Sequence, residues 1–120
     1  MKTDVKEAKA EYRRLLKALS RTGPVSHGYV QDRGPGAGGP SYQWTRKEKG
    51  KTVSVALSKE QFEAMREAIA NWREVQMTLK RMEQITRETI FRSLPDTKRR
   101  KPLTKKKIGL ILAPFGTGLQ

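Results

Sequence analysis

The chain has 120 residues, enough for one small domain with tails, and only 35% of them are hydrophobic. Its 26 lysines and arginines against 12 acidic residues give a net charge of +14, a balance typical of proteins that bind DNA, RNA or an anionic membrane surface. The absence of cysteine excludes disulfides, thiolate zinc sites and cysteine nucleophiles, and it fits a cytoplasmic protein.

The first predicted element is a helix over residues 3–19. Thr3 or Asp4 can cap its start, and Gly23 and Pro24 follow its end. Its apolar stripe comprises Val5, Ala8, Tyr12, Leu15, Leu16 and Leu19. This N-terminus leads into an amphipathic helix and lacks the continuous apolar run of a signal peptide, so we expect none.

The next predicted elements are extended. Residues 25–31 suggest a short extended segment, and the glycine- and proline-rich residues 33–40 a flexible loop. Residues 41–46 and 52–57 alternate apolar and polar side chains, which predicts a two-stranded hairpin whose turn is supplied by residues 47–51.

A long helix is predicted from Ser58 to about Arg92. Ser58 and Gln61 form a Ser-x-x-Gln capping box, and Leu57 and Phe62 occupy the positions of a hydrophobic staple. Apolar residues then recur on one helical face at Phe62, Met65, Ile69, Trp72, Val75, Leu79 and Met82. Seven basic and six acidic side chains nearly cancel along this helix, which is typical of a solvated face.

The composition changes at Ser93. The segment Leu94-Pro95-Asp96 ends the helix, and the remaining residues are strongly basic and then apolar with no clear period. We therefore expect residues 1–92 to form a helix–hairpin–helix domain and residues 93–120 a basic, flexible tail. No apolar run reaches the length of a membrane span, and Gly109, Pro114 and Gly116 argue against an amphipathic helix after Lys107 that could touch an anionic membrane, so no membrane partner is expected.

Four motifs follow one another over more than half of the chain. They are LSRTGPV (residues 19–25) with Gly28, GPSYQWTRK (39–47), GKTV (50–53) and LSKEQ (57–61). This succession, from Leu15 to about Ile85, resembles a small uncharacterised prokaryotic domain family often encoded near transposases. The resemblance implies a helix–hairpin–helix architecture and a mobile-element setting. Many similar proteins carry a cysteine cluster between the first motif and the hairpin, but residues 31–39 contain no cysteine, so no metal role carries over.

Three short features could be mistaken for catalytic or cofactor sites. His27 is the only histidine and lacks the partners that a metal site or a general base needs. The glycine-rich loop 34–39 and the Gly50-Lys51-Thr52 segment each lead into a predicted strand, whereas a phosphate-binding loop opens a helix. We expect no catalytic residue, no metal and no cofactor.

Two groups of basic residues are the candidate nucleic-acid contacts. On the hairpin they are Arg46, Lys47, Lys49 and Lys51, beside Tyr42 and Trp44, whose rings could stack on bases. Alternatively, Tyr42 or Trp44 packs under the long helix and the lysines only keep an edge strand soluble. In the tail they are Lys98, Arg99, Arg100, Lys101, Lys105, Lys106 and Lys107, which could release counterions from DNA or RNA, or alternatively serve only as a solvated tail.

The long helix is the candidate partner surface. The apolar stripe of this helix is most simply explained as core that packs against the first helix, which is about half as long. We therefore expect an interface around Trp72, with Leu79, Met82 and Ile85 uncovered, that could form a coiled coil.

The sequence thus predicts an α+β, mostly α protein: an N-terminal helix, a two-stranded hairpin, a long C-terminal helix and a basic tail. We expect a non-enzymatic nucleic-acid-binding accessory protein, with DNA favoured over RNA. The alternative is a protein–protein interaction module whose long helix pairs with itself or with a partner such as a transposase.

Overall fold

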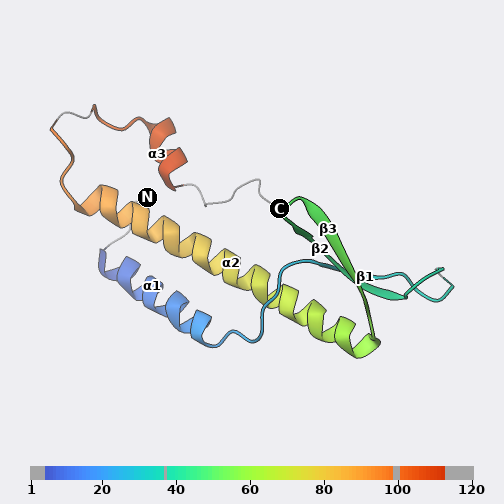
Figure 1. Cartoon of the computed structure of the whole chain (residues 1–120). Helices are drawn as coiled ribbons and strands as arrows, with labels where there is room; N and C mark the ends of the chain where they lie inside the picture. The colour runs from blue at the N-terminus through green and yellow to red at the C-terminus, as the bar shows by residue number, and fades with distance from the viewer. Residues whose placement is uncertain (1–4, 37, 99–100, 113–120) are drawn as a thin grey trace. The chain divides into compact units, whose positions relative to one another are not determined.

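The fold is α+β and mostly α, as predicted, but its sheet has three strands instead of two (Figure 1). The computed structural model describes residues 5–36, 38–98 and 101–112. In chain order, the described elements are α1 (Val5–Ser20), β1 (Tyr29–Asp32), β2 (Tyr42–Glu48), β3 (Lys51–Leu57), α2 (Lys59–Ser93) and α3 (Lys105–Leu112).

The chain divides into two compact units. One contains residues 22–75, with the sheet and the first part of α2. The other contains the described residues up to Arg21 and from Gln76 onward, with α1, the second part of α2 and α3. We call them the sheet unit and the helical unit, and each is described by itself.

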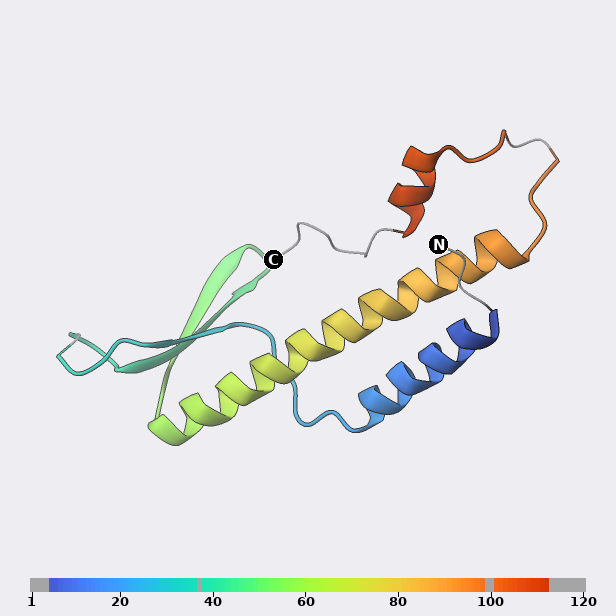
Figure 2. The same ribbon diagram turned by 180° about the vertical axis from the view of Figure 1, so that it is seen from behind.

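The sheet unit is built on an antiparallel sheet with the order β1-β2-β3 (Figure 2). The prediction of a two-stranded hairpin was incomplete, because part of the extended segment predicted before the glycine-rich loop forms a third strand, β1. β1 pairs with β2 along its whole length, from Tyr29 opposite Thr45 to Asp32 opposite Tyr42. The loop that reverses the chain between them is the glycine-rich segment. Two hydrogen bonds stabilise the start of this loop: the Gly34 amide donates to the Asp32 carboxylate at 3.0 Å, and the Arg33 amide donates to the Ser41 carbonyl at 2.7 Å.

The β2–β3 connection is tighter than the five-residue turn that the sequence suggested. Only Lys49 and Gly50 lie between the strands, and both have positive φ, 49° and 80°. Two consecutive residues with positive φ characterise the type I′ turn, whose twist matches that of the flanking strands. The turn therefore holds Lys49 at its tip.

The start of α2 confirms the predicted capping box. The Gln61 amide donates to the Ser58 hydroxyl at 3.1 Å, and the Ser58 amide donates to the Gln61 side-chain oxygen at 2.9 Å. Each residue satisfies a backbone donor of the other, so the first turn of the helix is closed without a tertiary partner.

The first part of α2 packs within the sheet unit. Phe62 is buried, and its ring lies 4.8 Å from the ring of Tyr42 on β2. The connecting segment before β1 is bound to the same helix, since the Ser26 amide donates to the Ala68 carbonyl and the Asn71 side chain donates to the Pro24 carbonyl. The N-terminal stripe of the long helix is thus covered by the sheet and this segment.

In the helical unit, α1 lies against the second part of α2. The Arg81 guanidinium donates to both Glu11 carboxylate oxygens at 2.7 Å, a bidentate pair that joins the two helices. These hydrogen bonds lower the pKa of Glu11 and raise that of Arg81. Ala8, Met82 and Ile85 are the buried apolar side chains among the described residues of this unit.

This arrangement corrects the predicted partner surface. Met82 and Ile85 were expected to be uncovered, but they are only 7% and 5% exposed. The physical reason is that the shorter α1 covers the second part of α2, whereas the expectation had placed it over the first part. Of the predicted interface residues, Leu79 is exposed, at 41%, and Trp72 is half-buried.

The predicted flexible tail contains a short helix, α3, over Lys105–Leu112. Thr104 caps it, because its hydroxyl accepts from the Lys107 amide at 3.1 Å and its carbonyl accepts from the Ile108 amide at 2.9 Å. Gly109 had argued against a helix here, but one glycine lowers helix propensity by only about 1 kcal/mol. None of the described helices is long and apolar enough to cross a membrane.

Candidate nucleic-acid interface

The basic residues after α2 form the first part of the predicted interface. Lys98 and Lys101 are exposed outside regular structure, whereas Arg99 and Arg100 lie outside the described residues. Lys105, Lys106 and Lys107 form the first turn of α3 and are exposed. None of the ion pairs between described residues includes any of these five lysines.

The three lysines of α3 stand at the end of the helix where positive charge is least favourable. The N-terminus of a helix carries a partial positive charge, and acidic side chains normally occupy its first turn. The first turn of α3 has no acidic residue. Its lysines and the backbone amides therefore contribute positive potential at one place, which a polyanion would neutralise.

The predicted cluster on the hairpin does not form one surface. Directly opposed residues of an antiparallel pair share a face, so the register places Arg46 and Lys51 on one face of the sheet and Lys47 on the other, with Lys49 in the turn. Arg46 also forms an ion pair with Glu48 at 2.7 Å, and its guanidinium lies over the Trp44 ring. Three of the four cations, all except Arg46, are exposed.

The two aromatic residues of β2 have structural contacts. Tyr42 packs against Phe62, and the Trp44 Nε1 donates to the His27 carbonyl at 3.0 Å. Both side chains are half-buried. Of the alternatives that the sequence left open, packing of Tyr42 under the long helix is confirmed.

One aromatic residue that sequence reasoning missed is exposed. Tyr29 lies on β1 opposite Thr45, which places it on the same face as Lys47, and its exposed fraction is 60%. The alternation of Tyr29 and Gln31 with Val30 was the available sequence pattern, but a four-residue strand is too short to show a convincing period.

The remaining sequence features have local structural roles. The His27 ring lies 5.0 Å from the Trp72 ring. Asp32, the carboxylate nearest to it in the sequence, accepts a hydrogen bond from the glycine-rich loop. In the part of the chain that the structure describes, no three His, Cys, Asp or Glu side chains are grouped so that they could hold a metal ion.

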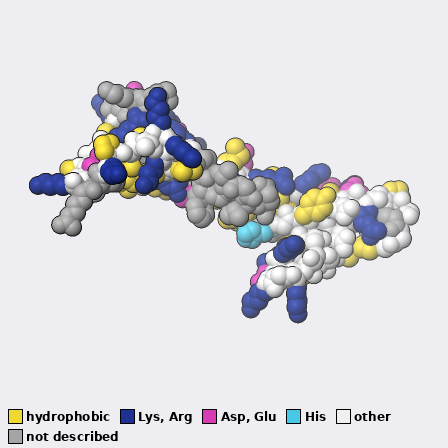
Figure 3. Space-filling view, turned by 90° about the horizontal axis from the view of Figure 1, so that it is seen from above, with side chains coloured by type: hydrophobic (Ala, Val, Ile, Leu, Met, Phe, Trp, Pro, Cys, Tyr) yellow, Lys and Arg dark blue, Asp and Glu magenta, His cyan; other side chains and the backbone are white. Residues whose placement is uncertain are grey.

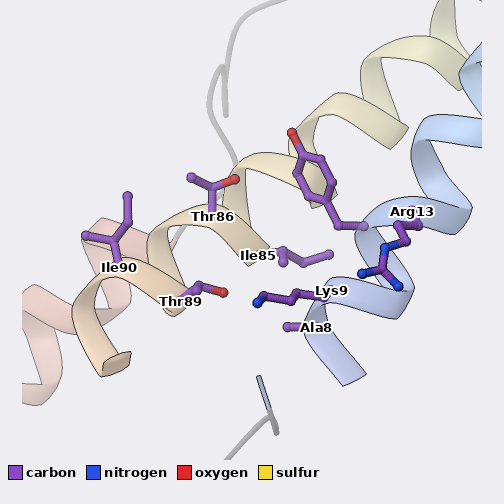
Figure 4. Close-up of a pocket in the computed structure, with 8 residues that line it drawn as sticks. Ala8, Lys9, Arg13, Ile85, Thr86, Thr89 and Ile90 are labelled. Carbon is purple, nitrogen blue, oxygen red and sulfur yellow. The ribbon is translucent and has the colours of Figure 1, made fainter. Parts of the chain in front are cut away.

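A hollow of about 300 Å³ opens between α1 and the second part of α2 (Figure 4). Ala8, Ile85 and Ile90 supply apolar surface, and Tyr12, two threonines and two basic residues line the remainder. The threonines are Thr86 and Thr89, and the basic residues are Lys9 and Arg13. None of the described residues that line the hollow is acidic. Its two basic residues are therefore an additional positive site, outside the predicted nucleic-acid contacts.

Figure 3 shows lysine and arginine side chains projecting from several places on one face of the surface, with few acidic side chains among them.

Comparisons with protein-family models, with curated proteins and with solved structures found no match to this chain.

Proposed function

We propose that this chain is a non-enzymatic accessory protein that binds nucleic acid through contacts to the phosphate backbone. The observation that supports the proposal best is the segregation of charge. Residues 58–92 carry a net charge of only +1, whereas residues 93–120 carry +6. The described lysines of this last segment are all exposed.

The hairpin supports the same function with a smaller number of contacts. Lys47, Lys49 and Lys51 extend from the two strands and their turn, and all three are exposed. Lysine is a point charge on a flexible stem, which suits phosphate contacts better than base recognition. Binding with little base selectivity is therefore the expected behaviour.

The sequence motifs support DNA over RNA, because the family that they resemble is encoded near transposases. The resemblance also favours a mobile-element setting, and the absence of cysteine favours the cytoplasm. Neither preference depends on the fold.

The test is a titration of a labelled DNA duplex with the full chain at several salt concentrations. If about five basic residues meet phosphates, log K should fall against log salt with a slope near −4 to −5. Replacing Lys105, Lys106 and Lys107 by glutamine should reduce the magnitude of that slope by about 2 to 3.

A matched control removes the same charge elsewhere. Lys17, Lys59 and Arg73 are exposed helical residues outside the proposed site, and their replacement by glutamine also removes three charges. This control should retain most of the affinity. An equal loss in both triple variants, or no binding by the unmodified protein at low salt, would contradict the proposed site.

A second candidate function is protein–protein interaction through the helical unit. Leu16 on α1 and Met77 and Leu79 on α2 are large apolar side chains that are exposed in this unit. A second copy or a partner such as a transposase could cover them. Sedimentation at rising concentration tests the self-association version, in which Leu79→Glu should keep the protein monomeric without unfolding it.

A further inference from the structure

The strand register sorts the charges of the sheet unit between two faces. One face, which we call the packed face, holds Tyr42, Trp44 and their cross-strand neighbours, and Phe62 lies against it. The sheet has two acidic residues, Asp32 and Glu48, and both belong to the packed face. The other face, which we call the polar face, comprises Tyr29, Gln31, Gln43, Thr45, Lys47, Thr52, Ser54 and Ala56.

The polar face is open to solvent. Six of its eight residues are exposed, and Gln43 and Thr45, which lie on the central strand, are half-buried. The Thr45 and Ser54 hydroxyls lie 3.3 Å apart across β2 and β3, which shows that these side chains share the face. The face therefore presents hydroxyls, amides, one cation and one aromatic ring, and no acidic group.

Tyr29 is held on a fixed piece of backbone. It follows Gly28, which has a φ of 114°, and the carbonyl of the preceding His27 accepts the indole hydrogen bond of Trp44. Its own strand is paired with β2 at four positions. The backbone that carries the ring therefore needs little further ordering when a ligand covers it.

The spacing on this face suits one nucleotide. Tyr29 is directly opposite Thr45, and Lys47 is two residues farther along β2. Diagonal neighbours of this kind are roughly 7–8 Å apart. The ring can stack on a base while the ammonium group meets a phosphate of the same strand, which is how sheet surfaces bind single strands without reading their sequence.

We propose that the polar face binds single-stranded nucleic acid by stacking a base on Tyr29 and contacting the backbone through Lys47. This inference rests on the proposed nucleic-acid-binding function and names the form of the ligand at one site. Single strands fit the face because the bases of a duplex are stacked and paired, so a ring on a flat surface reaches them only where they are unpaired. Binding of a duplex through its phosphates would involve only the lysines and not Tyr29.

The test compares two labelled probes, a 20-nucleotide oligothymidylate and a 20-base-pair duplex, with the full chain. Tyr29→Ala should weaken binding of the single strand by about 5- to 150-fold and change duplex binding less than about twofold. Tyr29→Phe keeps the ring and should retain single-strand affinity. Lys47→Gln should reduce the magnitude of the single-strand salt slope by about 0.7.

Val55→Ala is the matched control, because Val55 is an exposed residue of the same sheet on the packed face. It should leave binding of both probes unchanged, and circular dichroism should show that every variant is folded. If Tyr29→Ala has no effect on the single strand while the triple lysine variant still weakens duplex binding, the polar face is not the site although the proposed function stands. Failure to bind either probe overturns both, and binding of an acidic polypeptide in preference to the oligonucleotide overturns the assigned ligand.

Discussion

Replacing Gly28 by alanine should destabilise the sheet unit by about 2–4 kcal/mol. The φ of Gly28 is 114°, where a side chain causes backbone strain of about 1–3 kcal/mol. A Cβ at this position would lie 2.3 Å from the Trp44 Nε1 and 2.9 Å from the Thr45 carbonyl oxygen. The indole must then move, and its 3.0 Å hydrogen bond to the His27 carbonyl, worth about 0.5–1.5 kcal/mol, is lost.

Urea denaturation followed by tryptophan fluorescence measures this change. Both tryptophans of the chain, Trp44 and Trp72, lie in the sheet unit, so the emission reports on that unit. The transition midpoint should fall while the slope of the free energy of unfolding against urea stays constant. The loss in free energy is then read from the midpoint.

Gly36→Ala is the control for backbone strain alone. Gly36 has a φ of 78°, and a Cβ there would meet no atom within 4 Å. Its cost should be about 1–2 kcal/mol, which is the usual cost of the left-handed conformation for a residue with a Cβ. In a Trp44→Phe background the cost of Gly28→Ala should decrease, because the nearest obstructing atom is gone. Equal effects of Gly28→Ala and Gly36→Ala would refute the reasoning.

Three further predictions concern the helices. Ile85→Ala should lower the free energy of unfolding by about 2–4 kcal/mol, whereas Leu79→Ala should lower it by less than about 1 kcal/mol, because only the first side chain is buried; thermal unfolding by circular dichroism distinguishes the two. The hydrogen bonds from Arg81 lower the pKa of Glu11 in the folded state, so their stabilisation is present above the unfolded pKa of about 4.5 and is lost as the pH falls through the folded value. Glu11→Gln should therefore reduce stability at neutral pH and flatten the acid limb of a stability–pH curve, and an unchanged limb would show that the pair is not coupled to folding. Ser58→Ala removes the reciprocal cap of α2 and should cost about 1 kcal/mol in urea denaturation, and a neutral result would show that water satisfies these amides equally well.

The elements that the sequence predicted well are those encoded by local interactions. Ser58 and Gln61 are three residues apart, and each satisfies the backbone of the other, so their capping box can be read directly from the sequence. The alternation in β2 and β3 and the glycine in their turn likewise act between near neighbours. The basic character of the two candidate sites follows from composition alone.

What the sequence could not decide depends on contacts between distant residues. The stripe of α2 predicts an apolar face, but only tertiary packing determines that α1 covers Met82 and Ile85 and leaves Leu79 exposed, through a pair such as Glu11 and Arg81 that is 70 residues apart. β1 is too short to be a strand by itself and becomes one only because β2 supplies its hydrogen-bonding partners. That pairing places Tyr29 on the same face as Lys47 and Asp32 on the opposite face. Local patterns fix which residues are helical or extended, whereas the choice of neighbours, and with it the composition of each surface, is a property of the packed chain.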